Sequence, residues 1–266
     1  MRLNEKVAIV VGAGQQPGET IGNGRATAIR FAEEGANVLL VDKNEKLALE
    51  TLDLIENKGG AAKVQIADIT DEDDCKTIAT ACMNYFGKID ILHNNVGRSE
   101  GDTGTTEMDV KVWDQLMDMN LKGMFMTCKH VLPIMRKQNS GCIINISSIA
   151  SICSHNSITY KTGKGAVNTM THHLAMENAS YGIRANAILP GLMDTPMAIE
   201  RRAREQNLHR DEVRNARNNR VPLLKKMGTA WDVANASVFL ASEEANYITG
   251  LIMPVDGGLS AHIGGA

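Results

Sequence analysis

The 266-residue sequence lacks several features that would place it in other classes of protein. Its five cysteines are odd in number and include no C-x-x-C spacing, so they fit reduced, buried thiols better than a disulfide framework or a zinc site. No other metal-ligand spacing is present. No uncharged apolar run approaches the roughly 18 residues that a membrane-spanning helix needs. These absences predict a cytoplasmic protein that binds neither a metal nor a membrane.

The sequence also has no large excess of positive or negative charge. The 28 lysines and arginines against 31 aspartates and glutamates leave a formal net charge of -3, which gives no field for attracting nucleic acid. Aromatic residues are scarce, and 14 methionines stand against four phenylalanines, so adaptable side chains fill the gaps of the core. With 43% hydrophobic residues, the chain can still bury a sizeable core.

Short apolar runs and helix-prone segments alternate along the whole chain. The runs are typical of strands buried on both faces, and no internal repeat or linker interrupts the series. We therefore predict one α/β domain over residues 1–266, in which about seven parallel strands form a doubly wound sheet with helices on both faces. The predicted strands span residues 6–11, 37–42, 62–68, 89–95, 142–148, 183–189 and 251–256.

Several helix boundaries are also readable. Asn44 is expected to cap a helix that runs to about residue 58. Thr70 followed by Asp73 resembles a capping box at the start of the next helix. A long helical region is predicted from about residue 109 to 137, and it contains Asn120.

A glycine-rich turn from Gly12 to Gly24 follows the first predicted strand. In a doubly wound fold this turn places a pyrophosphate at the N-terminus of the next helix, where free N–H groups and the helix dipole favour negative charge. Asp42 ends the second strand, and a carboxylate there can hold a ribose 2′-hydroxyl and would repel a 2′-phosphate. The pattern predicts NAD rather than NADP. The alternatives are an ordinary flexible loop and, for Asp42, a charge at a helix N-terminus.

The stretch from Ser148 to Lys164 brings a hydroxyl, a phenol and an amine to the end of a strand. If the chain is helical from about residue 158, Tyr160 and Lys164 share a face. A cation beside a tyrosine, whose unperturbed pKa is near 10, would let the phenol exchange a proton at neutral pH. Because a Tyr four residues before a Lys also arises by chance, this pair needs support from the rest of the chain.

Several motifs in order resemble the short-chain dehydrogenases/reductases, and the likeness covers almost the whole chain. N-N-V-G from Asn94 is similar to the family's N-N-A-G, and P-G-L-M-D-T-P-M from Pro190 is similar to its P-G-x-x-x-T segment. V-D-G-G near the C-terminus resembles its subunit-interface tail. The residues that resemble the catalytic tetrad are Asn120, Ser148, Tyr160 and Lys164.

The resemblance implies an NAD-dependent oxidoreductase that transfers hydride between a secondary alcohol, or its ketone, and the nicotinamide. Tyr160 would be the base, or the acid in reduction, while Ser148 holds the substrate oxygen. Lys164 would lower the pKa of the phenol and bind the nicotinamide ribose, and Asn120 would anchor a water that passes the proton on.

The same resemblance implies that the cofactor is held at the strand ends. Asp68 and Ile69 would flank the adenine, and Met193 and Thr195 would meet the nicotinamide. The full set of implied cofactor-binding residues is Gly12, Gly22, Gly24, Asp42, Asp68, Ile69, Asn95, Gly97, Tyr160, Lys164, Met193 and Thr195.

Two departures from the family pattern stand out. The glycine-rich turn has six more residues than the family's, which leaves Gly14 and Gly18 as further candidates for phosphate contacts. Ser148 precedes Tyr160 by 12 positions where 13 is commoner, and Ser147 would restore 13. We choose Ser148 because a loop loses a residue more easily than a strand slips its register.

Residues 192–228, the covering segment, are expected to close over the substrate. Residues 200–220 contain seven arginines against four acidic residues. They form either a solvated helix pair or a site in which Arg201, close after Met197, holds an anionic group of the substrate. The candidate substrate contacts are Ser148, His155, Met197 and Arg201.

Two other functions remain open. A non-redox enzyme of the same fold, such as an epimerase or dehydratase, would keep NAD tightly bound. A cofactor-sensing binding protein would have lost the tyrosine or the lysine, and this chain has both. The resemblance further implies a homotetramer, in which the helices that carry Asn120 and Tyr160 pair between subunits.

Overall fold

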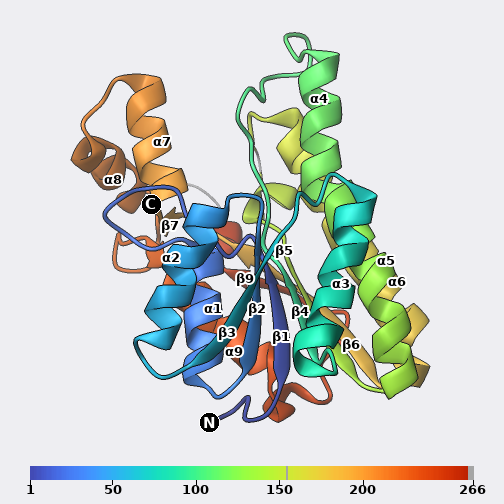
Figure 1. Ribbon diagram of the computed structural model, residues 1–266. Helices are drawn as coiled ribbons and strands as arrows, with labels where there is room; N and C mark the ends of the chain where they lie inside the picture. The colour runs from blue at the N-terminus through green and yellow to red at the C-terminus, as the bar shows by residue number, and fades with distance from the viewer. Residues whose placement is uncertain (154, 263–266) are drawn as a thin grey trace.

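A computed structural model describes residues 1–153 and 155–262 (Figure 1). Within these residues, seven parallel strands form one sheet, as predicted, and their order is β3-β2-β1-β4-β5-β6-β9. The strands are β1 (Val7–Val11), β2 (Asn37–Asp42), β3 (Ala61–Ile66), β4 (Ile91–Asn94), β5 (Gly141–Ile146), β6 (Ile183–Pro190) and β9 (Ile252–Val255). Their ends differ from the predicted ones by two residues at most.

The strand order reverses at β1, and this reversal positions the site. The chain runs outward from β1 to β2 and β3, then returns to place β4 on the other side of β1. Val11 pairs with Val41 on one side and with Asn94 on the other. The loops that leave these strands therefore diverge and open a crevice at their carboxyl ends.

Helices cover both faces of the sheet (Figure 1). α1 and α9 pack together on one face, and α3 packs with α5 on the other. Besides these, α2 lies on the first face and α6 on the second. Their bounds are α1 (Asn23–Glu33), α2 (Glu45–Glu56), α3 (Glu72–Phe86), α5 (Gly123–Gln138), α6 (Ile158–Asn178) and α9 (Ala230–Ala241).

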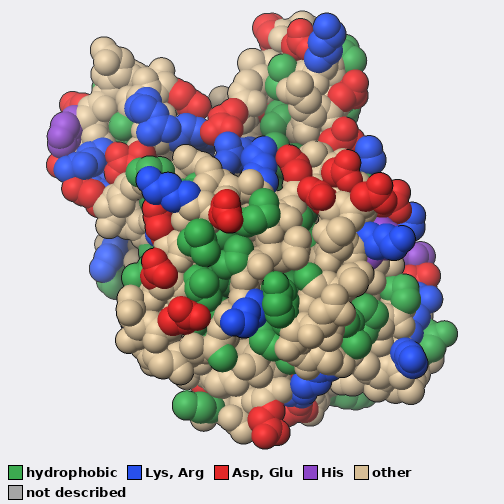
Figure 2. Space-filling view, viewed as in Figure 1, with side chains coloured by type: hydrophobic (Ala, Val, Ile, Leu, Met, Phe, Trp, Pro, Cys, Tyr) green, Lys and Arg blue, Asp and Glu red, His purple; other side chains and the backbone are tan. Residues whose placement is uncertain are grey.

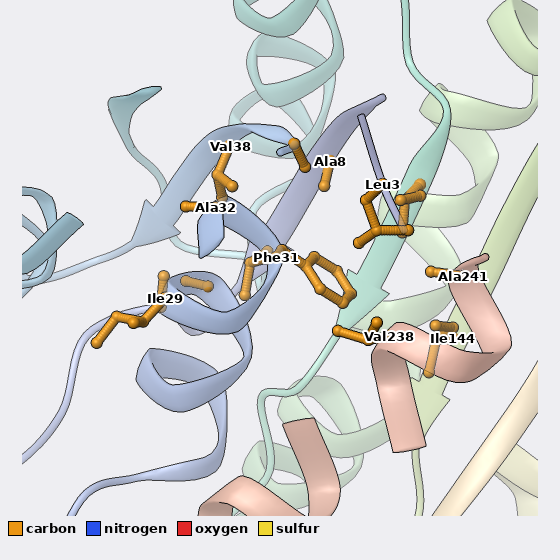
Figure 3. Close-up of a cluster of buried hydrophobic side chains, with 14 of the residues drawn as sticks. Leu3, Ala8, Ile29, Phe31, Ala32, Val38, Ile144, Val238 and Ala241 are labelled. Atoms are coloured by element: carbon orange, nitrogen blue, oxygen red, sulfur yellow. The ribbon is translucent and has the colours of Figure 1, made fainter. Parts of the chain in front are cut away.

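Each face of the sheet has its own apolar core. Along β1, Ala8 and Val10 belong to one cluster, while Val7, Ile9 and Val11 belong to the other. Figure 3 shows the first cluster, in which the Phe31 ring of α1 lies between the sheet and α9. Because side chains alternate along a strand, a strand covered on both faces must be apolar at every position, which is why the sequence shows continuous apolar runs.

The start of α3 differs from the prediction. The N-cap is Asp71, whose side chain accepts from the backbone N–H of Asp74 at 3.1 Å. Thr70 is unavailable, because its hydroxyl donates to the Asp68 carboxylate at 2.8 Å. The predicted capping box of Thr70 and Asp73 is therefore wrong. Asn44, in contrast, caps α2 by accepting from the N–H of Leu47.

The predicted helical region over residues 109–137 is interrupted. It consists of α4 (Val110–Met117), a π-helical turn (Asp118–Lys122) and α5. Asn120 lies inside the π-helical turn and is fully buried. π-Helical turns are rare and occur frequently at functional sites.

The covering segment stands apart from the sheet, opposite α4 (Figure 1). It contains α7 (Pro196–Gln206) and α8 (Arg210–Asn218), and its two ends are joined by the short strands β7 (Met193–Asp194) and β8 (Gly228–Thr229). The remaining elements are 3-10 turns over Ile149–Ser151, Ala179–Tyr181, Glu243–Ala245 and Leu259–Ala261. No helix in the described part of the chain is long and apolar enough to cross a membrane.

Candidate active site

A cavity of about 1160 Å³ opens at the carboxyl ends of the strands, large enough for a dinucleotide together with a small substrate. Figure 2 shows the molecule hollowed on this side, between the covering segment and α4. The cavity is lined by every residue proposed above for the cofactor and the substrate except Gly18, one of the further candidates for phosphate contacts. Asn120 is not among the lining residues. In residues 1–153 and 155–262, no group of three or more His, Cys, Asp or Glu side chains could hold a metal.

Two glycines let the turn after β1 pass very close to α1. A Cβ on Gly24 would lie 1.9 Å from the carbonyl oxygen of Gly12. Gly12 has a φ of +80°, which disfavours any side chain, and a Cβ there would lie 2.9 Å from Cγ2 of Val96. The missing side chains leave the N-terminus of α1 open to the cavity. A cradle of this kind fits a dinucleotide pyrophosphate.

Asp42 organises the same turn from the end of β2. One carboxylate oxygen accepts from the N–H of Gly14 at 2.9 Å, and the other accepts from the N–H of Asn44 at 3.0 Å. The neighbouring Lys43 does not approach this carboxylate as a partner, because its ammonium lies 3.7 Å from Asp68. This part of the cavity therefore presents two carboxylates and one cation that is already paired.

Tyr160 lies on the first turn of α6 and lines the cavity. Burial raises the pKa of its phenol above the ordinary value of 10, while a hydrogen bond from Ser148 and the positive charges of Arg202 and Arg201 act to lower it. Two of the three groups that favour the phenolate thus belong to the covering segment.

Lys164 lies one turn further along α6 and is almost fully buried. Its ammonium is 5.8 Å from the centroid of the Tyr160 ring and donates to the carbonyl of Ile146 at 2.7 Å. Burial lowers the pKa of Lys164 to about 7. The charges of Arg202 and Arg201 also act to lower the pKa of the phenol. The part predicted for Lys164 in lowering that pKa stays a prediction.

The two candidate serines face different groups. The Ser147 hydroxyl is buried and donates to the carbonyl of Lys164 at 2.9 Å. The Ser148 oxygen accepts from the N–H of Ala150 at 3.1 Å and interacts with Tyr160. Ser147 therefore fastens α6 to the end of β5, whereas Ser148 interacts with the phenol.

Asn120 holds a loop rather than facing the cavity. Its amide oxygen accepts from the N–H of Arg98 at 3.0 Å, and its amide nitrogen donates to the carbonyls of Arg98 and Leu116, each at 2.8 Å. A Cβ on Gly97 would lie 2.7 Å from Nζ of Lys164 and 3.0 Å from Oδ1 of Asn120. The backbone at Gly97 is thus packed closely between Asn120 and Lys164.

Comparison with known proteins agrees with this geometry. The model of a family described as Enoyl-(Acyl carrier protein) reductase matches residues 19–260. The chain belongs to the short-chain dehydrogenase/reductase family. It is 36% identical to 3-oxoacyl-[acyl-carrier-protein] reductase FabG of Thermotoga maritima, over 97% of this chain and 99% of that protein. It is also 36% identical to 2-(R)-hydroxypropyl-CoM dehydrogenase of Xanthobacter autotrophicus, over 96% and 99%.

The crystal structure of levodione reductase superposes on this chain with a TM-score of 0.92 and 31% identity, covering 98% of this chain and 100% of that one. This short-chain dehydrogenase/reductase is accordingly an oxidoreductase that uses a nicotinamide cofactor. The family, the fold and the class of reaction predicted from the sequence are confirmed.

The lengthened turn of this dehydrogenase/reductase is held by its own side chains and by the covering segment. The Gln15 amide accepts from the N–H of Gly22 at 2.7 Å. A Cβ on Gly18 would lie 2.7 Å from Cβ of Pro196, so the tip of the turn packs against α7. Glu19 forms ion pairs with Arg210 and Arg214 of α8. The six additional residues thus connect the glycine-rich turn over residues 12–24, here called the cofactor turn, to the covering segment.

The other candidate substrate contacts lie around Tyr160. The His155 ring centroid is 6.0 Å from that of Tyr160, and burial, opposed mainly by a backbone hydrogen bond, lowers the pKa of His155. Met197 is 43% exposed. Arg201 donates to the Ser99 hydroxyl at 3.3 Å and lies 3.7 Å from the Glu205 carboxylate.

Asp102, which supports the helix that carries Tyr160, was not identified from the sequence. Asp102, in the loop before α4, accepts from the N–H groups of Thr159 and Tyr160 at 3.1 and 2.6 Å. It caps the helix that carries the phenol and offsets the desolvation of its first N–H groups. The cap comes from more than fifty positions earlier in the chain, so no local pattern could indicate it.

Proposed function

We propose that this enzyme interconverts a secondary alcohol and its ketone with NAD. The proposal rests on one observation: Tyr160 and Ser148 lie together in a cavity that also contains the close approach of Gly12 and Gly24, the glycine cradle. When bound, the nicotinamide accepts or supplies the hydride. The protein must then move one proton at the substrate oxygen.

Tyr160 and Ser148 are proposed to handle that oxygen. The Ser148 oxygen already accepts a hydrogen bond from Ala150, so its own proton is available to donate. During oxidation Ser148 would hold the alcohol oxygen while the Tyr160 phenolate removes its proton. In reduction the phenol would return that proton to the developing alkoxide.

Lys164 and Asn120 are proposed to support the phenol. A buried ammonium near the ring stabilises the phenolate, and Lys164 would also bind the nicotinamide ribose. Asn120 would position Gly97 against Lys164 and help to hold a water that passes the proton outward. Because its side chain is occupied by Arg98 and Leu116, its part is positioning rather than contact with the substrate.

The choice of NAD is supported by the adenine end of the cavity. Asp42 and Asp68 both line it, and Lys43 is paired with Asp68. A 2′-phosphate there would meet two carboxylates, whereas a 2′-hydroxyl could donate to Asp42. The proposed cofactor contacts otherwise remain those named from the sequence.

We further propose a cytoplasmic homotetramer. The five cysteines are free thiols, which suits a reducing compartment. The helices expected to pair between subunits expose apolar side chains, with Phe125 of α5 51% exposed and Met176 of α6 66% exposed. Light scattering at micromolar concentration should give a mass well above the 28.8 kDa of one chain.

The function is tested by a panel of secondary alcohols assayed with NAD and, separately, with NADP. We expect reduction of NAD by at least one member of the panel and a clear preference for NAD over NADP. Tightly bound NAD that shows no net reduction with any member would favour the epimerase or dehydratase alternative.

A further inference from the structure

The arginines of the covering segment divide into two groups. Arg210 and Arg214 of α8 do not line the cavity, and both are paired with carboxylates, including Glu19. The remaining five line the cavity: Arg201, Arg202, Arg204, Arg217 and Arg220. Figure 2 shows Lys and Arg side chains gathered at the base of the hollow.

Two of the lining arginines are partly buried and lack a counter-ion. Among the described residues, Arg202 donates only to the carbonyl of Ala198, at 3.2 Å, and Arg217 only to the sulfur of Met227, at 3.3 Å. Neither has a carboxylate within 4.0 Å among residues 1–153 and 155–262. A guanidinium carries five N–H donors, so most of their hydrogen-bonding capacity is unused.

The two guanidinium groups also repel one another. Burial and the nearby charges of Arg202 and Arg220 lower the pKa of Arg217 to about 9. Burial and Arg201 likewise lower the pKa of Arg202. Like charges held together in a partly buried place are costly unless an anion joins them.

The position of Arg202 connects this cluster to the reaction. Arg202 lines the same cavity as Tyr160 and His155, and its charge is among those that act on the pKa of both groups. The proposed adenine end is instead marked by Asp42, which accepts from the N–H of Gly14 in the turn after β1. An anion bound at Arg202 would therefore belong to the substrate.

We propose that Arg202 and Arg217 bind an oxyanion group, a carboxylate, sulfonate or phosphate, carried by the substrate alcohol or ketone. The planar fork of a guanidinium matches such a group through paired hydrogen bonds. This assignment differs from the one made from sequence, because Arg201 is already engaged by Ser99 and Glu205. It rests on the proposed function for the identity of the reacting group.

The binding test uses inorganic sulfate as the probe, titrated calorimetrically at low ionic strength with and without saturating NAD. We expect one sulfate to bind in both conditions. Arg202→Gln and Arg217→Gln should each weaken its binding by about ten- to a hundredfold, the loss of a charged hydrogen-bonding group. Lys226→Gln removes an exposed cation of the same segment outside the cavity and should change the binding less than twofold.

Three outcomes would overturn the proposal. The wild-type protein could bind no sulfate, the variants could bind sulfate as well as the wild type, or saturating NAD could displace the sulfate that depends on these arginines. Arg202→Lys keeps the charge and serves if Arg202→Gln does not fold; it should show a smaller loss than Gln. Because the titration needs no turnover, it decides the anion site even if the protein were not a dehydrogenase.

Turnover then distinguishes the kinds of oxyanion. The probes are 2-oxopropanesulfonate, 2-oxopropylphosphonate and acetoacetate, with methyl acetoacetate as the neutral control, each reduced with NADH. Arg217→Gln is used here because Arg217 is not among the charges that act on the phenol. It should raise KM for the preferred anionic ketone about ten- to a hundredfold and leave the ester within threefold. A wild type that prefers the ester contradicts the anion site, whereas failure to reduce any ketone counts against the proposed function alone.

Discussion

The cofactor turn and the covering segment satisfy their polar groups in opposite ways. In the turn, Asp42 accepts two backbone N–H groups and the Gln15 amide accepts a third. In the covering segment, Arg202 and Arg217 lie in the cavity without a carboxylate in the described part of the chain. The first region has its shape fixed before any ligand arrives, and the second has a charge that only a ligand can balance.

The largest effect is expected at Tyr160, the proposed acid-base residue, which belongs to neither of these two regions. Tyr160→Phe keeps the ring and removes the ionisable oxygen, so turnover should fall by about a thousandfold, within the range of lost acid-base catalysis. NADH affinity, measured by fluorescence titration, should stay within about threefold, since neither binding region is altered. Retained turnover would remove Tyr160 from the mechanism. Tyr181→Phe, at a partly exposed tyrosine outside the cavity, is the matched control.

The turn can be broken by adding one methyl group. Gly24→Ala places a Cβ 1.9 Å from the Gly12 carbonyl, which must shift. We expect NAD affinity to fall by about a hundredfold and the free energy of unfolding by about 1–3 kcal/mol, as for overpacking. Gly165→Ala is the control, because its Cβ would meet nothing within 4 Å. In a helix it should stabilise the protein by about 0.5–1 kcal/mol, and equal behaviour of the two variants in a urea titration would refute the cradle.

A smaller change should alter which cofactor the turn accepts. Asp42→Ala should weaken NAD binding by about tenfold and relieve the exclusion of NADP, because the carboxylate that would bond the 2′-hydroxyl is lost. Affinities for both cofactors are compared with those of Asp42→Asn, which keeps an acceptor for one backbone N–H but no charge. A wild-type enzyme that already prefers NADP would make the carboxylate argument untenable.

The smallest effect is expected in the covering segment, and its sign is the informative part. Arg217→Met removes one of several mutually repelling charges from a partly buried place. The free energy of unfolding should rise by about 1 kcal/mol, since unfavourable buried charges are often replaced by apolar side chains with a gain in stability. Urea unfolding measures it. A loss of stability would show that Arg217 supports the fold rather than waiting for an anion.

The fold and much of the site could be predicted because the signals are local. A strand covered on both faces must be apolar throughout, so all seven strands show in the sequence. The spacing of Tyr160 and Lys164 likewise places them on one helix face. Between Ser147 and Ser148, the choice was made because a one-residue slip of a strand turns its side chains to the other face of the sheet.

What could not be predicted depends on packing between distant segments. The cap that Asp102 supplies to α6 comes from a different loop. Arg201 and Arg202 are neighbours on α7 and point in directions about 100° apart, so only the position of the helix decides which one remains unpaired. The same is true of Thr70, whose hydroxyl is used by Asp68 rather than by the helix it was expected to cap.

The ion pairs of Glu19 connect the lengthened turn to α8, so changes in one region can affect the other. Arg210 and Arg214 share this carboxylate, so a ligand that shifts the turn also changes the energy of α8, which carries Arg217. Such coupling is reciprocal by thermodynamic necessity: whatever factor NAD contributes to substrate affinity, the substrate returns to NAD. The six additional residues thereby give the proposed cofactor region and the covering segment a direct connection through Glu19, along which such coupling would run.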